Sequence, residues 1–248
     1  LRSIAKKHNL SIIEDAAQTL GSKFGDRMAG TFGDFGVFSF HGTKVMTTGE
    51  GGMLVTDDAE VAAKAILFSG SYMLYEQNGA APPQDVFSRY QADIPNLSLR
   101  MGEVTAALAR PQIPLLQERR RVWNAHYDDL ERRLSAIHNV TVPKRDPREA
   151  YVASSIQFSI SGLTTAHMHQ LVDYCAERGV KLKWFGREEA VGFTSNFEHW
   201  RYAPAGQKMR QTQAALGGLC DMRIPLTLTT QDAELIAEII GASIDAVN

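Results

Sequence analysis

The sequence has little of what disulfide-rich, membrane-spanning or nucleic-acid-binding proteins depend on. It holds only two cysteines, Cys175 and Cys220, and no CxxC or zinc-ligand spacing surrounds either one. Isolated thiols are typical of buried side chains in a reducing compartment, so we expect a cytoplasmic protein without disulfides, with a redox or metal role as the alternative. No apolar run approaches the length of a membrane span.

Charge of one sign is also lacking. Lys and Arg number 26 and Asp and Glu 28, which gives a net charge of -2. This balance favours neither nucleic acid nor an anionic membrane as a partner, although a small anionic ligand stays compatible with it. His167 and His169 cannot share one helix face at their spacing, so we predict no metal site there.

What the chain does have is the composition of a globular protein. Its 248 residues are 44% hydrophobic, enough for one large domain or two modest ones. Residues 1–9 are typical of a helix, and Leu10–Glu14 of a strand that follows it at once. Helix followed directly by strand is half of a βαβ crossover, which predicts a parallel sheet with helices on its faces.

Asp15 comes directly after that first strand, and Gln18 follows in the next turn. In an open α/β sheet, ligands bind beyond the carboxyl ends of the strands, so both residues occupy a favoured position for a site. The alternative is that Asp15 only caps the turn that follows it.

The stretch from Phe38 to Gly52 contains the most informative residue, Lys44. An apolar strand over 35–40 precedes it, and a returning strand over 53–56 follows a loop rich in threonine and glycine. A lysine on such a constrained turn can attack an aldehyde once its amine is deprotonated, and Ser39 could supply a hydroxyl to a phosphate. The alternative is a surface or salt-bridged lysine.

The rest of the first half continues the alternation of strands and helices. We expect a hairpin or excursion over 22–33, a helix over 57–70, and an irregular or disordered segment over 71–95. A helix over 101–134 should be interrupted by Pro111 and Pro114. The arginine run 119–121 is interpreted as a solvated helical face, with a phosphate site as the alternative.

The pattern changes from about Ile137. Strands over 140–142, 154–159 and 180–184, a helix over 164–178 and a final helix with a capping box at Thr229 and Asp232 predict a smaller α+β unit. We therefore divide the chain into a large domain, 1–125, and a small C-terminal domain, 126–248.

Two motifs resemble a known family. IIEDAAQTLGS, from Ile12, and GDFGVFSFHGTKVMTTGEGGMLVTDD, from Gly33, are similar to the DegT/DnrJ/EryC1/StrS sugar aminotransferases, which belong to the fold-type-I pyridoxal-phosphate (PLP) enzymes. By resemblance, Asp15 pairs with the pyridine nitrogen, Gln18 contacts the cofactor ring, Ser39 contacts the phosphate, and Lys44 forms the internal aldimine. The resemblance is strong over residues 10–58 and looser from LRMGEVTAAL, at Leu99.

The resemblance implies a fold, an activity and partners. The expected fold is α/β: a PLP-dependent-transferase-like large domain with a mostly parallel sheet whose N-terminal part is missing, and a smaller α+β C-terminal domain. The expected reaction moves an amino group from glutamate or glutamine to a ketosugar, expected to be nucleotide-linked, in a homodimer with shared active sites. A non-catalytic PLP-binding protein and a sugar dehydratase are the alternatives, but the dehydratases carry histidine where this chain has Lys44.

The chain departs from the family in three places. Ser98 stands where relatives have an asparagine that reaches the neighbouring subunit's cofactor phosphate, and Asn96 lies two residues earlier. No glycine-serine/threonine phosphate loop or stacking aromatic precedes Leu1, so we expect the chain to be the C-terminal two thirds of a longer protein. The segment 184–195, WFGREEAVGFTS, follows no general family pattern; it is expected to line the acceptor pocket, with an ordinary surface loop as the alternative.

Overall fold

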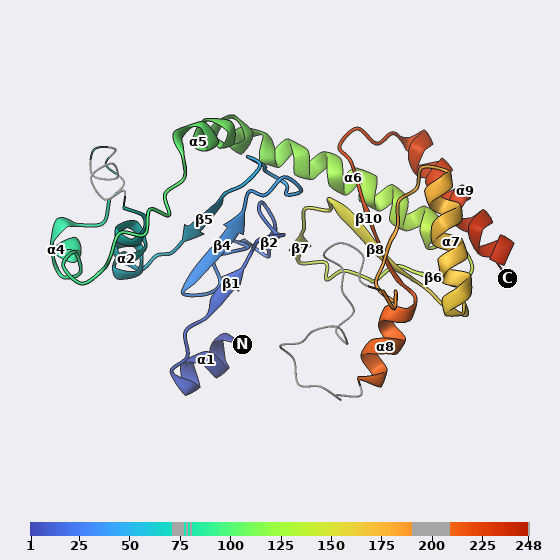
Figure 1. The fold of residues 1–248 in the computed structure, drawn as a ribbon, viewed down its shortest axis with the longest axis horizontal. Helices are drawn as coiled ribbons and strands as arrows, with labels where there is room; N and C mark the ends of the chain where they lie inside the picture. The colour runs from blue at the N-terminus through green and yellow to red at the C-terminus, as the bar shows by residue number, and fades with distance from the viewer. Residues whose placement is uncertain (71–76, 78, 80, 190–208, 248) are drawn as a thin grey trace. The chain divides into compact units, whose positions relative to one another are not determined.

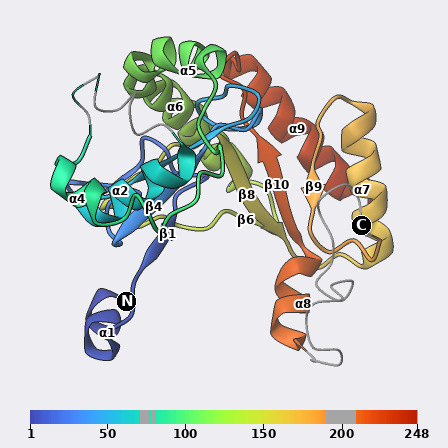
Figure 2. The ribbon, with the colours of Figure 1, turned by 60° about the vertical axis from the view of Figure 1, so that its left-hand side comes forward.

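The structure is a computed structural model that describes residues 1–70, 77, 79, 81–189 and 209–247. The chain forms two compact units. Figure 1 shows the ribbon coloured from the N-terminus to the C-terminus, and Figure 2 shows it from a second direction. Unit 1 comprises residues 1–120 and 147–152, and unit 2 comprises residues 121–146 and 153–248. The chain therefore returns to unit 1 for six residues before it completes unit 2.

Unit 1 is built on a three-stranded sheet with the order β1-β4-β5. Strand β1 (Ile13–Asp15) pairs in parallel with β4 (Phe35–Ser39), and β4 pairs antiparallel with β5 (Gly52–Val55). Helix α1 (Arg2–His8) leads into β1. A second small sheet joins the hairpin β2 (Lys23–Phe24) and β3 (Arg27–Met28) to β7 (Glu149–Ala150), the returning segment.

The helices of unit 1 follow the sheet in the sequence. Their bounds are α2 (Ala59–Ser69), α4 (Gln84–Ser88), α5 (Glu103–Ala109), the 3-10 helix η1 (Arg110–Leu115) and α6 (Leu116–Leu134), which continues into unit 2. Asp58 caps α2 by accepting hydrogen bonds from the backbone N–H of Glu60 and Val61, and Gly70 ends it in a left-handed conformation. Tyr90 donates a hydrogen bond to Glu60 at 2.6 Å, which fastens the segment after α4 to α2.

Unit 2 is a four-stranded antiparallel sheet with helices packed on one face. The sheet has the order β6-β8-β10-β9, and its elements are β6 (Val140–Thr141), β8 (Ser155–Ile160), α7 (Thr165–Glu177), β9 (Lys183–Trp184), α8 (Arg210–Gly217), β10 (Leu219–Arg223) and α9 (Thr230–Val247). Ile156, Phe158 and Ile160 alternate with more exposed residues along β8 and are all buried, as expected for a sheet covered on one side. Trp123 of α6 donates its indole N–H to the carbonyl of Ile224 at 2.8 Å.

Most elements predicted from the sequence are confirmed, although the strands are shorter than expected. The hairpin, the break of the long helix at Pro111 and Pro114, and the capping box are all present. Thr229 and Asp232 hydrogen-bond each other reciprocally, and the bonds from Thr229 hold the pKa of Asp232 below its ordinary value. The irregular segment contains the short helix α4, which buries Val86 and Phe87, and part of that segment lies outside the described residues.

Two further predictions concern the sheet and the domains. The expected sheet was mostly parallel, whereas the described strands of unit 1 contain one parallel and one antiparallel pair in their main sheet, because β5 returns directly after a loop. The division into domains at 125/126 stays a prediction, since a compact unit is not by itself a domain that folds alone. Among the described helices, none is both long and apolar enough to cross a bilayer.

Both cysteines are buried free thiols, as predicted, and they generate a pH-dependence. Burial, followed by the influence of Cys175 and Asp221, raises the pKa of Cys220 to about 12. The thiol of an unfolded chain ionises near a pKa of about 8.5. Above that pH the folded protein holds a proton that the unfolded chain has lost, so this thiol's contribution to stability is complete at neutral pH and declines toward pH 12.

We therefore expect the free energy of unfolding of the wild type to fall with pH above about 9 more steeply than that of Cys220→Ala, by up to about 1.4 kcal/mol per pH unit. Urea unfolding of both proteins at several values between about pH 8 and pH 10.5 measures this difference. Equal slopes for the two proteins would show that Cys220 ionises normally in the folded state.

Candidate active site

The carboxyl ends of β1 and β4 bring two of the predicted site residues together. In the parallel register Asp15 lies opposite Val37, so their side chains point to the same face of the sheet. Ser39 follows Val37 by two residues along β4 and therefore points to that face as well. Asp15 and Ser39 thus lie on one face, at the edge where α/β sheets bind ligands.

Asp15 also organises the turn that follows it. Its Oδ1 accepts a hydrogen bond from the N–H of Ala17 at 3.0 Å, and the N–H of Ala16 continues the pairing with β4 by donating to the Val37 carbonyl at 2.9 Å. Gln18 is exposed on this turn. The bond from Ala17 shows that Asp15 caps this turn, as the alternative interpretation expected. The Asp15 carboxylate is exposed and has a second oxygen, so it can also bind another group.

Lys44 lies in a loop that leaves β4 at the same edge. Two backbone bonds close the loop: the N–H of Phe40 donates to Gly51 at 2.8 Å, and the N–H of Thr48 donates to the carbonyl of Phe40 at 2.9 Å. The N–H of Lys44 donates to His41 at 2.9 Å, which forms a tight turn. Lys44 is half-buried, and it stands on the constrained turn that the sequence predicts rather than on a free tail.

Ser39 begins this loop and interacts within it. Its Oγ accepts a hydrogen bond from the N–H of His41 at 3.3 Å, which leaves the hydroxyl proton able to donate to a ligand. The structure therefore brings Asp15 and Ser39 to one edge of the sheet and places the loop of Lys44 directly after Ser39. Their roles toward a cofactor stay predictions.

The interpretation of the arginine run as a solvated face is wrong for Arg119 and Arg120, whereas Arg121 is exposed as predicted. Arg119 and Arg120 are half-buried and donate hydrogen bonds to backbone carbonyls, at 3.3 Å to Val45 and at 3.3 Å to Gly21. Val45 follows Lys44, and Gly21 ends the segment that holds Asp15 and Gln18. Sequence patterns could not reveal these contacts, because they join residues 74 and 99 positions apart.

Asn96 and Ser98 interact with each other. The carbonyl oxygen of the Asn96 side chain accepts a hydrogen bond from the N–H of Ser98 at 2.8 Å. Ser98 has a positive φ of 53°, and the Asn96 amide packs so closely on Gly70 that a Cβ there would lie 2.2 Å from it. Asn96 therefore shapes its own turn.

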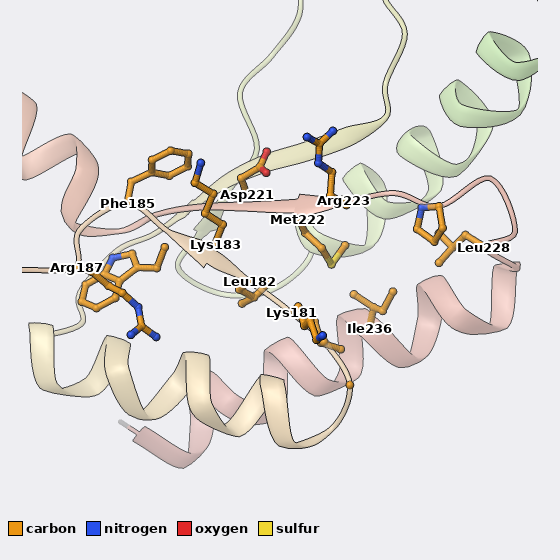
Figure 3. A pocket seen from close by; sticks show the side chains of 14 residues that line it. Lys181, Leu182, Lys183, Phe185, Arg187, Asp221, Met222, Arg223, Leu228 and Ile236 are labelled. Carbon is orange, nitrogen blue, oxygen red and sulfur yellow. The ribbon is translucent and has the colours of Figure 1, made fainter. Parts of the chain in front are cut away.

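The segment predicted to line an acceptor pocket lies partly within unit 2 and partly, from residue 190 on, outside the described residues. Trp184 is buried at 3% exposure and donates its indole N–H to Gly217 at 2.8 Å, so it is not part of a surface loop. Phe185 and Arg187 line a cavity of about 700 Å³ in unit 2. Figure 3 shows the carboxylate of Asp221 between the side chains of Lys183 and Arg223, so these two cations have an acidic side chain beside them.

Comparison with known proteins identifies the family. The family model described as the DegT/DnrJ/EryC1/StrS aminotransferase family matches residues 1–240. The chain belongs to this family. This confirms the resemblance found in the two sequence motifs.

Several relatives and solved structures match the chain over part of their length. GDP-perosamine synthase of Caulobacter vibrioides is 37% identical over 115 residues, which cover 46% of this chain and 28% of that protein. L-glutamine:2-deoxy-scyllo-inosose aminotransferase of Micromonospora echinospora is 34% identical over 137 residues, covering 55% and 32%. EpsN of Bacillus subtilis, which carries pyridoxal phosphate in its name, is 32% identical over 117 residues, covering 47% and 27%.

The solved structures show the fold. The aminotransferase TlmJ of Streptoalloteichus hindustanus matches with a TM-score of 0.79 at 19% identity, over 99% of this chain and 62% of its own. An aminotransferase of Psychrobacter cryohalolentis matches with a TM-score of 0.78 at 22% identity, over 99% and 65%. The fold is therefore the α/β fold of aminotransferases of this family, and the chain spans less than two thirds of the proteins that it resembles.

Gly36 lies in β4, within the sheet that carries the candidate site, and its close packing generates a prediction. Gly36 lies opposite Glu14 in the β1 and β4 pair, and a Cβ on it would lie 2.1 Å from the backbone oxygen of Gly30. Gly30 is itself held there, because its N–H donates to the Glu14 carboxylate at 2.6 Å. Gly36→Ala should lower the free energy of unfolding by about 1–3 kcal/mol, because backbone must move to admit the methyl group.

Gly217→Ala in α8 is the matched control, since nothing lies within 4 Å of its Cβ position. It should leave stability unchanged or raise it slightly. Urea unfolding measures both variants, and a Gly36→Ala protein as stable as the control would contradict the packing described here.

Proposed function

We propose that the protein is a PLP-dependent aminotransferase that moves an amino group from glutamate or glutamine to a nucleotide-linked ketosugar. The observation that carries this proposal is the shared face of Asp15 and Ser39 at the carboxyl edge of the sheet, from which the loop of Lys44 departs. Membership of an aminotransferase family supports it.

The donor set of this edge fits the cofactor. PLP supplies an aldehyde that binds amines covalently and a ring that accepts electrons from the bond broken beside the amine carbon. Lys44 would hold the cofactor through its amine and, when that amine is free, would move a proton at the substrate carbon. The carboxylate of Asp15 would hold the proton on the pyridine nitrogen, Ser39 would donate to the phosphate, and Gln18 would contact the ring.

The substrate class is supported by the names of relatives. One relative is named for a GDP-linked sugar and another for transfer from L-glutamine, and a Helicobacter pylori relative, 34% identical over 131 residues, is named for a UDP-linked amino sugar. A nucleotide-linked ketosugar acceptor and a glutamate or glutamine donor follow from these names by analogy.

The two alternatives predict different products. A non-catalytic binding protein would hold PLP without converting it to the pyridoxamine form when glutamate or glutamine is added. A dehydratase would release a sugar that has lost a hydroxyl group, which mass spectrometry distinguishes from a sugar that has gained an amine. Lys44 favours transamination, because it supplies the amine that moves the proton.

In the full-length protein, Lys44→Ala should abolish the absorbance of the lysine-bound cofactor and lower kcat by about 10²–10⁴-fold, because the proton-moving group is lost. Borohydride reduction followed by peptide mass spectrometry should place the cofactor on Lys44 in the wild type. Lys7→Ala, at an exposed position of α1, is the control and should behave as the wild type. Reduced cofactor on another lysine would refute the assignment.

We also propose that the partner of this chain is a second copy of itself. Val104 and Leu108 on α5 are 78% and 53% exposed, and Ile113 and Leu115 of η1 are 56% and 48% exposed. Val104 and Leu108 are four residues apart on α5 and therefore share one face of that helix, and neighbouring exposed apolar side chains are typical of an interaction surface. The homodimer with shared active sites that the resemblance implies would cover them.

In the full-length protein, Val104→Asp combined with Leu108→Asp should weaken dimerisation by about 30- to 1,000-fold in Kd, because two apolar side chains lose a dry environment. Sedimentation equilibrium measures this effect. Leu235→Asp is the control, since Leu235 is 54% exposed on α9 of unit 2. A wild type that sediments as a monomer, or an unchanged Kd in the double variant, would contradict the proposal.

A further inference from the structure

The loop of Lys44 is hydrogen-bonded by a side chain from a distant part of unit 1. The amide of Gln112, in η1, forms two hydrogen bonds with the backbone of Thr47. The N–H of Thr47 donates to Oε1 at 3.3 Å, and Nε2 donates to the Thr47 carbonyl at 2.7 Å. Nε2 also donates to the carbonyl of Leu108 at 2.8 Å, which fixes the Gln112 side chain to its own helix turn.

Arg119, in the neighbouring helix α6, donates hydrogen bonds both to this loop and to Gln112. Its Nη1 donates to the carbonyl of Val45 at 3.3 Å and to Oε1 of Gln112 at 3.1 Å. Val45 and Met46 are buried, and Met46 packs in a cluster with Phe40. The three residues that follow Lys44 are thus held by two side chains and by the core of unit 1.

These contacts matter because the loop lacks regular structure. Residues 44–48 belong to neither helix nor strand, so their half-buried backbone groups need partners from elsewhere. On the other side of Lys44, its own N–H bonds to His41, and the chain runs directly into β4. The backbone is therefore fixed both before and after Lys44. The amine can change its position only by rotation about the bonds of the lysine side chain.

We propose that Gln112 and Arg119 form a clamp that positions Lys44 for covalent attachment of the cofactor and for proton transfer. This inference rests on the proposed function. Both are positioning residues, since they act through the backbone of Val45 and Thr47. A displacement of about 1 Å at a reacting group can cost about 10²-fold in rate, so a clamp at this place has consequences beyond stability.

The test uses the full-length protein with the variants Gln112→Leu, Arg119→Met and the conservative Arg119→Lys. Gln170→Leu, at an exposed position of α7, is the matched control. Hydrogen exchange of the cofactor-free proteins should show that the amide of Thr47 exchanges at least about tenfold faster in Gln112→Leu than in the wild type, since its acceptor is gone. The control should show wild-type protection.

Spectroscopy of the loaded proteins provides the second readout. The pH titration of the lysine-bound absorbance should shift in Gln112→Leu and Arg119→Met, and the first half-reaction with glutamate or glutamine should slow by about 10- to 100-fold. Arg119→Lys should recover part of the wild-type titration and part of the wild-type rate, because a cation can still reach the Val45 carbonyl. If Arg119→Met does not fold, Arg119→Lys is the variant in which the role of Arg119 is measured. A purely structural role would leave the titration of the correctly folded variants unchanged.

The outcomes separate the two proposals. A wild type that binds the cofactor on Lys44, together with variants whose exchange and titration match those of Gln170→Leu, overturns the clamp alone. A wild type that forms no covalent bond between Lys44 and the cofactor overturns the proposed function and the positioning role with it. Faster exchange at Thr47 combined with a shifted titration supports the clamp.

Discussion

The parallel pairing of β1 with β4 is the constraint on which the site depends. Because the two strands run in the same direction, both end at one edge of the sheet, and the register that sets Asp15 opposite Val37 also sets Ser39 on the same face. An antiparallel pairing would have sent these side chains to opposite edges. The close packing of Gly36 on Gly30 and the two backbone bonds to the Glu14 carboxylate hold the same pair of strands from the other face.

The loop of Lys44 presents a different physical problem. The loop has no regular secondary structure, so its backbone N–H and C=O groups lack the hydrogen-bond partners that a helix or a sheet would supply. Because the loop is half-buried, water cannot replace all of these partners. Side chains from η1 and from the start of α6 solve this problem, since Gln112 and Arg119 bond the loop after Lys44. Arg120 bonds Gly21, at the end of the segment that carries Asp15. Adjacent arginines of one helix thus contact the loop of Lys44 and the end of the segment that carries Asp15.

Local patterns predicted much of this architecture. The caps at Asp58 and at Thr229, the hairpin over 22–33 and the proline break each depend on residues close together in sequence, and the structure has them. The order of strand, Asp15, strand and Lys44 also indicated which edge of the sheet holds the candidate site. The short helix α4, strand β7 and strand β10 went unpredicted, because each is fixed by packing or pairing with distant elements.

The arginine run shows where such reasoning fails. A basic stretch at the start of a helix is compatible with solvent exposure, and only the fold brings Arg119 within reach of Val45. The roles of Asp15, Gln18, Ser39 and Lys44 toward PLP are likewise chemical inferences from placement, made stronger by the family to which the chain belongs.

A crystal structure of the full-length protein with PLP bound is the most direct measurement of the central claim. The account predicts that Lys44 Nζ is bonded to the aldehyde carbon, while the Asp15 carboxylate lies about 2.7–2.9 Å from the pyridine nitrogen at the other end of the ring. Electron density that places the cofactor away from this edge of the sheet, or with Asp15 turned from the ring nitrogen, would contradict it.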